Sequence, residues 1–393
     1  MSFWRTEPTA AVLPPNADTG EVAGCNRCRL LPVILAALWA ALGAAPSASA
    51  AEADAAAKAW TFVSFPDFFN FDVPNPNPKW DDAVHWYLDH LKAEQPRFAL
   101  VAGDLVDGHW WDSPKQIEHL GNVYYGGWMR RMRDHGLLPI YTAIGDHELG
   151  DDPWPTKKSK LAPHFREAFV AHMDHPTNGP EGFKERAYWV REGGVLVVTV
   201  ETFELHDGKV VPTVSGKQLK WVEETLRRHA DATFKIVQGH VPILPKVRSR
   251  SSSRLMLKGG HRSGLWKVMA EHGVDLYFCG EHHAITCRQH QDVWQVVHGA
   301  SWGRVPTVNY LKGTVAGHTL RVELKRIELT LEGSHMWNIH KGRGPREIVR
   351  ISEAHRKRGF QPVGTLVIDK SSGRKKYTRR TGSFAETFKP LDD

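Results

Sequence analysis

The stretch Val101-Ala102-Gly103-Asp104-Leu105-Val106-Asp107-Gly108 gives the first indication of the fold. The apolar run over residues 98–102 predicts a short buried strand, and two carboxylates follow it closely. In an open α/β sheet, ligands bind in the crevice beyond the carboxyl ends of the strands. We therefore expect Asp104 to lie at the mouth of a site, although glycine and aspartate after a strand are also typical of a capped turn.

Four other apolar runs end in the same way. Their ends read Phe65-Pro66-Asp67, Ile144-Gly145-Asp146-His147-Glu148, Gln238-Gly239-His240-Val241-Pro242 and Cys279-Gly280-Glu281-His282-His283. Five strands that each deliver an Asp, Glu or His just past their ends favour one shared site over coincidence. Carboxylate and imidazole suit hard or borderline divalent metals. Two such ions, about 3.5–4 Å apart, could clamp the oxygens of a phosphoryl displacement.

The order of the patterns predicts the fold class. Helical spacing over residues 80–95 lies between strands expected at 60–65 and 98–102, which predicts two parallel strands joined by a helix. Helices are also expected over 117–132, 161–173, 218–229 and 265–272. Beyond residue 293 the pattern changes to strands, at 293–297, 319–323, 327–331 and 364–368. This order favours α/β architecture, a four-layer α/β/β/α sandwich of two mixed sheets with helices outside.

The first 50 residues have the pattern of a secretory signal. Arg27 and Arg29 precede an apolar run over 30–42, and Ala48-Ser49-Ala50 resembles a cleavage site. We therefore expect export to the periplasm or the extracellular space. The run is short for a membrane span, and an uncleaved anchor is the alternative. After the signal we expect a linker over 51–59, one domain over 60–340 and a basic extension over 341–393 that packs on the same domain.

Charge is unevenly distributed along the chain, whose formal net charge is +7. Residues 341–380 contain 13 Lys and Arg against 3 Asp and Glu, so the remainder is slightly acidic. A solvated basic face explains this block simply, and attraction to an anionic envelope surface is the alternative. No base-stacking motif stands out, so we do not expect nucleic acid as a partner. Cys279 and Cys287 could form a disulfide in an exported protein or stay as two buried thiols.

Together the strand ends resemble the calcineurin-like metallophosphoesterases, over roughly residues 60–303. That family has the motifs D-x-H, G-D-x-x-D, G-N-H-[DE], G-H-x-P and G-H-x-H. Here the second and fourth match fully, and the third and fifth match with one change each. The resemblance implies an enzyme, a metal-dependent phosphoesterase. It would hydrolyse phosphate mono- or diesters at a dinuclear site with a metal-bound hydroxide.

The resemblance also implies roles for individual residues. Asp104 would bridge two divalent ions, Asp67 and His283 would complete the first ion's shell, and a further three residues would complete the second. Those three are Asp146, His240 and Glu281. His147 matches the residue that protonates the leaving group. Asp107 would support this shell through hydrogen bonds, and His298 on the next strand could orient a ligand.

Three positions depart from the family motifs. Phe69 replaces a metal-binding histidine, Asp146 replaces an asparagine, and Glu281 replaces a histidine. An oxygen-rich second site favours Mn or Mg, with Fe or Zn as the alternative. Asn70 or Asp72 could substitute for the lost histidine. We therefore expect a firmly held ion at the second site and a weaker one at the first.

Other interpretations stay open. A different alignment of the fifth motif would make His282 a metal ligand. Otherwise His282 is a spacer whose side chain faces away from the site. His85, His90 and His109 are interpreted as surface or helix residues. The chain could also be a degenerate family member that binds a partner with one metal or none. A nuclease or cyclic-nucleotide diesterase is a further alternative, motivated by the basic loop at 248–262 and the basic C-terminal block.

Overall fold

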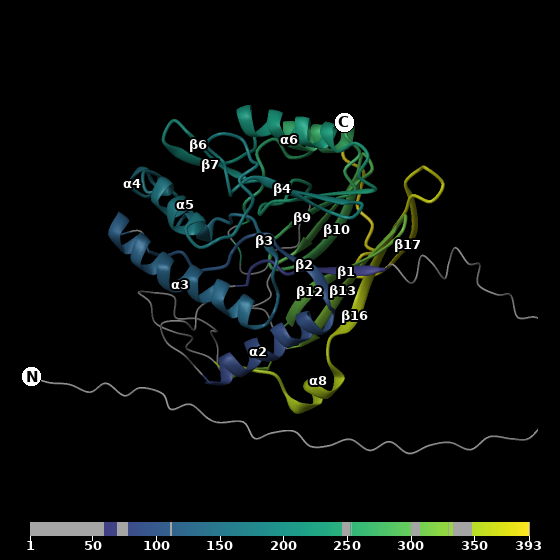
Figure 1. Ribbon diagram of the computed structural model, residues 1–393, viewed down its shortest axis with the longest axis horizontal. Coiled ribbons are helices and arrows are strands. Elements are labelled where there is room, and N and C mark those ends of the chain that lie inside the picture. The colour runs from purple at the N-terminus through teal and green to yellow at the C-terminus, as the bar shows by residue number, and fades with distance from the viewer. Residues whose placement is uncertain are drawn as a thin grey trace, which may run out of the picture. The chain divides into compact units, whose positions relative to one another are not determined.

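The computed structural model describes residues 59–68, 78–110, 112–245, 252, 254–299, 307–328, 330–332 and 348–392. Within these residues the chain forms two large mixed sheets with helices packed against them (Figure 1). The predicted signal segment, and the linker up to residue 58, lie outside the described residues. The same holds for Phe69, Asn70 and Asp72, so the predictions for them remain predictions.

The larger sheet has seven strands. In spatial order they are β17 (Lys376–Gly382), β16 (Gln361–Asp369), β13 (Thr319–Glu328), β12 (Thr307–Ala316), β1 (Trp60–Ser64), β2 (Pro96–Val101) and β3 (Ile140–Thr142). As predicted, β1 and β2 are parallel and are joined by helix α2 (Pro78–Ala93). Because β3 is also parallel to β2, the carboxyl ends of these three strands meet at one edge.

The smaller sheet has six strands. In spatial order they are β10 (Ile285–His290), β11 (Val293–His298), β9 (Leu276–Cys279), β8 (Phe234–Gln238), β5 (Val195–Thr199) and β4 (Tyr188–Glu192). Strands β5, β8, β9 and β11 are parallel neighbours. A hairpin with Gly193-Gly194 at its turn joins β4 and β5. Two small hairpins pair β6 (Phe203–His206) with β7 (Lys209–Pro212), and β14 (Thr330–Glu332) with β15 (Ile348–Arg350).

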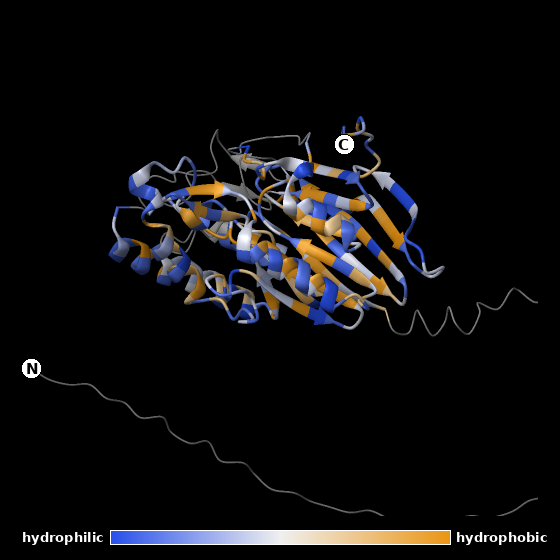
Figure 2. Ribbon diagram, turned by 90° about the horizontal axis from the view of Figure 1, so that it is seen from above, coloured by the Kyte–Doolittle hydropathy of each residue, from blue (hydrophilic) through white to orange (hydrophobic). Residues whose placement is uncertain are grey.

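Helices of the described chain present polar outer faces in Figure 2. The longer ones are α2, α3 (Pro114–Asp134), α5 (Ala162–Val170), α6 (Gly216–Arg228) and α7 (Gly264–Glu271); the shorter ones are α4 (Thr156–Ser159), α8 (Glu353–Arg358), η1 (His147–Leu149) and η2 (Gly260–Arg262). Helix α3 begins after Ser113, whose side chain accepts the backbone N–H of Gln116. It continues through Gly126-Gly127 to Asp134.

Both faces are buried in the middle of the sheets, for example on β2, β5 and β8, as a four-layer structure requires. Phe62 on β1 belongs to the core between the sheets and stacks on Phe98 with ring centroids 5.3 Å apart. Its neighbour Val63 points the other way, into the core that includes the helices. A Cβ at Gly313 would lie 2.1 Å from the Phe62 ring, so glycine on β12 makes room for that ring. The predicted fold class is confirmed.

Some strand predictions are wrong or incomplete. The strand expected at 327–331 falls on two elements of different sheets, because β13, which ends at Glu328, belongs to the larger sheet and β14, which begins at Thr330, pairs with β15. Strands β10, β12 and β17 were not predicted. β17 is a polar strand at the edge of the sheet, where charged residues protect against edge pairing. Cys279 and Cys287 are free, buried thiols. None of the described helices has the length and apolarity needed to cross a membrane.

Candidate metal centre

Five acidic or imidazole side chains gather where strands of the two sheets end. They are Asp67 after β1, Asp104 after β2, Asp146 after β3, His240 after β8 and Glu281 after β9. All five side chains are at most 2% exposed. The sequence had predicted every one of them as a metal ligand, and the structure brings them together.

His240 lies at the centre of this group. Its Nδ1 is 2.6 Å from the carbonyl oxygen of Ala102, so Nδ1 carries a proton and donates it. Its Nε2 then points at three carboxylates, 2.9 Å from Asp146 Oδ1, 3.4 Å from Asp104 Oδ1 and 3.5 Å from Glu281 Oε2. A carbonyl that fixes one nitrogen while the other faces carboxylates is the usual arrangement of a metal-binding histidine.

The backbone at the strand ends is shaped for this convergence. Asp67, Asp104 and Glu281 have φ angles of 55°, 62° and 63°, in the left-handed region that side chains rarely adopt. Such a conformation costs about 1–3 kcal/mol per residue and is concentrated at functional sites. A Cβ at Gly145 would lie 2.1 Å from Asp104 Oδ1, and one at Gly280 would lie 2.5 Å from Asp67 Oδ1. Both glycines therefore allow the carboxylates to lie against backbone.

The donor set fits divalent cations. Asp67, Asp104 and His240 offer ligand atoms within 4.8 Å of one another, and so do Asp146, His240 and Glu281. Four buried carboxylates this close are costly unless positive charge neutralises them. Burial, followed by the charge of Asp146, raises the pKa of Asp104 well above its usual value. Carboxylate oxygen and imidazole nitrogen are ligands for Mg, Mn, Fe or Zn.

His147 lies beside this group with one nitrogen fixed. Its Nδ1 is 2.6 Å from the backbone carbonyl of Asp107 and donates to it. Its Nε2 lies 4.0 Å from Asp104 Oδ2 and 3.8 Å from Asp151 Oδ1. Burial opposes protonation, but the carboxylates of Asp104, Asp146 and Asp151 outweigh it and raise the pKa of His147 well above its usual value. Bound cations would reduce this shift because they neutralise the same carboxylates.

The remaining predicted residues lie at different distances from the centre. His283 Nε2 is 3.9 Å from Asp67 Oδ2, close enough for both atoms to reach one ion. Asp107 meets His147 through its backbone carbonyl. His282 turns toward the Leu255 carbonyl, with Nε2 at 3.1 Å. His298 is fully buried, and its Nε2 lies 2.8 Å from Ser64 Oγ, so it links β11 to β1 across the two sheets.

Glu148 is a buried carboxylate to which the sequence assigned no role. It accepts the backbone N–H groups of Asp104 at 2.8 Å, Leu105 at 2.8 Å and Gly145 at 2.7 Å. These bonds tie the turn after β2 to the turn after β3, so Glu148 fixes the backbone that carries Asp104. Its place directly after His147 is the sequence signal that could have indicated it.

His109 is misassigned by the sequence, which placed it on the surface or on a helix. Its Nε2 lies 3.3 Å from Asp151 Oδ2 and 3.7 Å from Asp107 Oδ1, beside His147. The reason is the turn at Gly108, which has a φ of 72° and where a Cβ would lie 1.8 Å from the His147 carbonyl oxygen. This turn directs the chain back along the site. Asp151, with a φ of 64°, was also missed.

Fold and site together define a metallophosphoesterase architecture. The family model for calcineurin-like phosphoesterases matches residues 76–284, and the chain belongs to that family. The matched range begins after Asp67.

Several solved structures resemble the chain. The structure of PhoD resembles it with a TM-score of 0.51 and 10% identity, over 82% of this chain and 72% of PhoD. This likeness supports the fold alone. GAP50 of Plasmodium resembles the chain with a TM-score of 0.42 and 14% identity, over 75% of this chain and 90% of GAP50. Vacuolar Protein Sorting 29 from Cryptosporidium parvum resembles the chain with a TM-score of 0.30 and 10% identity, over 75% of this chain and 97% of that protein. A search of curated proteins found no match.

Proposed function

We propose that the chain is an exported enzyme that hydrolyses phosphate mono- or diesters with the help of two divalent metal ions. The observation that carries the proposal is the convergence of four buried carboxylates and one oriented imidazole from five strand ends. Membership of the calcineurin-like phosphoesterase family supports the hydrolase assignment. Export rests on the signal-like pattern of residues 1–50.

The proposed metal ligands follow the family motifs, and the convergence of the strand ends supports them. One ion would be held by Asp67, Asp104 and His283. The other would be held by Asp104, Asp146, His240 and Glu281. When bound, divalent ions supply Lewis-acid charge that activates water and neutralises the phosphoryl oxygens. The excess of carboxylate oxygen over imidazole favours Mn or Mg over Zn or Fe.

The protein's own proton chemistry is assigned to His147. Because its Nδ1 donates to the Asp107 carbonyl, its Nε2 is directed toward Asp104 and Asp151. In the proposed reaction Nε2 would carry the proton, and Asp151, which is not among the proposed ligands, would favour the protonated ring. Transfer of this proton to the leaving oxygen avoids release of a strongly basic alkoxide. Asp151, 3.8 Å from Nε2, helps to orient the ring.

Electrostatics gives a separate reason to expect metal dependence. The buried carboxylates of Asp67, Asp104, Asp146 and Glu281 would repel a phosphate ester, which is itself an anion. Since like charges brought together in a buried site are strongly unfavourable, substrate binding requires cations there. The metal-free protein should therefore bind phosphate poorly as well as being inactive.

A direct test combines metal removal with two substrates. Protein treated with chelator and then given Mn or Mg should hydrolyse an aryl phosphate monoester or a bis-aryl diester, and mild chelation should remove the activity. The ratio of the two rates gives the substrate class. If the protein binds metal but turns over neither ester, the hydrolase proposal is wrong. The binding-module interpretation, motivated by Phe69, would then be favoured.

A further inference from the structure

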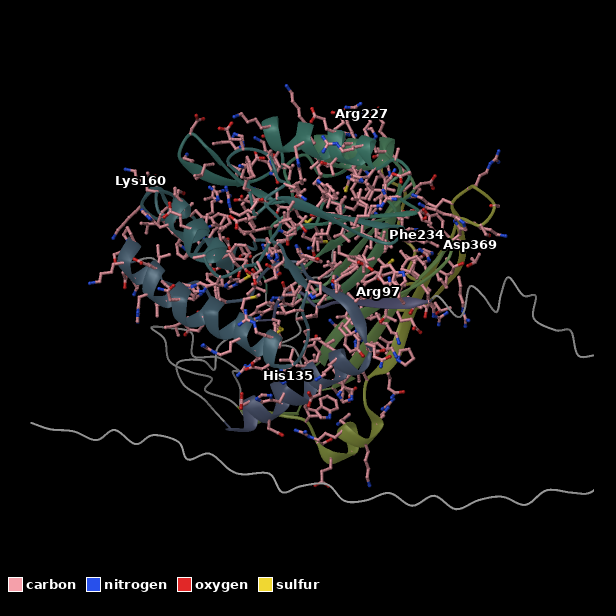
Figure 3. The ribbon with its side chains drawn as sticks, in the orientation of Figure 1. Arg97, His135, Lys160, Arg227, Phe234 and Asp369 are labelled. Carbon is pink, nitrogen blue, oxygen red and sulfur yellow. The ribbon has the colours of Figure 1, made fainter. Side chains whose placement is uncertain are left out.

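Two histidines on the helices share a close contact outside the candidate metal centre. His85 lies on α2, and His135 is the residue at which α3 ends. Nδ1 of His85 is 2.7 Å from Nε2 of His135, and the ring centroids are 4.7 Å apart. Figure 3 labels His135 where the end of α3 meets α2. The His85 side chain is 49% exposed, so solvent reaches this pair.

The outer nitrogen of each ring faces a group that can only accept a proton. His135 Nδ1 lies 2.8 Å from the carbonyl oxygen of Arg131, and His85 Nε2 lies 3.3 Å from Asp81 Oδ2. The carboxylate is itself held by Arg131, whose Nη2 donates to Asp81 Oδ1 at 2.8 Å. An acceptor beside each outer nitrogen favours an N–H there, and the four residues form a closed ring of contacts.

This assignment leaves the inner nitrogens of His85 and His135 with lone pairs when both rings are neutral. With an N–H at each outer nitrogen, two lone pairs would face each other at 2.7 Å, and a cation between the inner nitrogens would relieve their repulsion. The cation is either a shared proton or a metal ion. Neutral imidazole is a good ligand for Zn, Ni and Cu. Carboxylate or carbonyl partners on the outer nitrogens are the groups that orient metal-binding histidines in proteins.

We infer that His85 and His135 form a second metal site, for a borderline divalent ion such as Zn²⁺ or Cu²⁺, which fastens α2 to the end of α3. The ion would replace the shared proton, which passes to water, and water would complete the coordination. Zn–N bonds of about 2.0–2.1 Å place two tetrahedral ligands about 3.3 Å apart. The nitrogens must therefore separate by roughly 0.6 Å, which the exposed His85 ring permits.

The site is separate from the candidate metal centre. His135 precedes the amino end of β3, whereas Asp146 follows its carboxyl end. The inference therefore does not depend on the proposed phosphoesterase activity. It also differs in chemistry, because two imidazoles select Zn or Cu while the carboxylate-rich centre favours Mn or Mg. This difference allows the two sites to be measured separately.

The test is Zn²⁺ binding to chelator-treated protein by equilibrium dialysis, with excess Mg²⁺ present to compete at the carboxylate-rich centre. Wild type should retain one more Zn²⁺ per chain than His85→Asn, or bind that ion at least tenfold more tightly. His90→Asn is the matched control, since His90 lies on the same helix and its Nδ1 bonds to the Trp86 carbonyl of that helix. Asp104→Asn should keep this Zn²⁺.

Cu²⁺ provides an independent readout. Electron paramagnetic resonance of the wild type loaded with one Cu²⁺ per chain should show a nitrogen-coupling pattern that differs from that of His85→Asn, in which Cu²⁺ could bind only at the carboxylate-rich centre. Equal Zn²⁺ binding by wild type and His85→Asn, with no His85-dependent Cu²⁺ signal, would overturn the inference and assign the contact to a shared proton. His135→Asn should match His85→Asn. If that buried substitution prevents folding, the half-exposed His85 still decides the question.

Discussion

Glu148→Gln should destabilise the fold although it changes one atom. The carboxylate accepts three backbone N–H groups, two at Oε2 and one at Oε1. Glutamine can keep the two bonds from Asp104 and Gly145, but its NH₂ then faces the N–H of Leu105. An orphaned buried donor costs about 1–3 kcal/mol, and each remaining bond loses about 1 kcal/mol when its acceptor is no longer charged. A neutral amide is easier to bury, which offsets part of this loss.

The net expectation is a loss of about 2–4 kcal/mol in the free energy of unfolding. Urea denaturation followed by tryptophan fluorescence measures this as a lower midpoint. The control is Glu167→Gln on α5, where the side chain is 75% exposed and the change should stay within about 0.5 kcal/mol. An unchanged midpoint for Glu148→Gln would refute the assignment of Glu148 as the tie between the two turns.

Three further predictions concern single side chains. His147→Ala should lower turnover by roughly 10²–10⁴-fold with unchanged metal content, as steady-state rates and elemental analysis would show; loss of metal would mean that His147 is a ligand. His175 accepts the Thr142 N–H at Nε2 and donates to the Glu185 carbonyl, so only the neutral ring fits, and burial lowers its pKa to about 4. Because an unfolded histidine titrates near 6.5, the stability that the neutral His175 ring contributes is complete above pH 6.5 and falls as the pH approaches 4. About 2 kcal/mol should be lost by pH 5, and His175→Gln should remove this part of the pH dependence of unfolding. An equal pH dependence in both proteins would contradict that assignment. Phe69→His should tighten the weaker of two ions in a calorimetric titration, and two equally tight ions in wild type would count against unequal sites.

The sequence predicted which side chains converge because they follow strands that are rich in apolar residues. Asp104, Asp146 and His240 each come directly after such a run, and parallel strands deliver their ends to one edge. The architecture could be predicted for the same reason, since strand and helix periods alternate clearly up to residue 279. These features depend on local sequence.

Features that depend on distant contacts could not be predicted in this way. Strand β17 is polar along its whole length and exists because it pairs with β16. His109 reaches the site because Gly108 reverses the chain next to the His147 carbonyl. His85 and His135 are 50 residues apart, and they meet only when α2 packs beside α3. No short-range pattern contains this information.

The central claim is that the carboxylates and imidazole at the strand ends hold catalytic metal ions. The most direct measurement is Mn content per chain, by elemental analysis after chelation and reloading, for wild type, Asp104→Asn and the control Asp89→Asn on the exposed surface of α2. Wild type and Asp89→Asn should retain two ions. Asp104→Asn should retain fewer and lose phosphoesterase activity with an unchanged circular dichroism spectrum. Full Mn content and full activity in Asp104→Asn would contradict the claim.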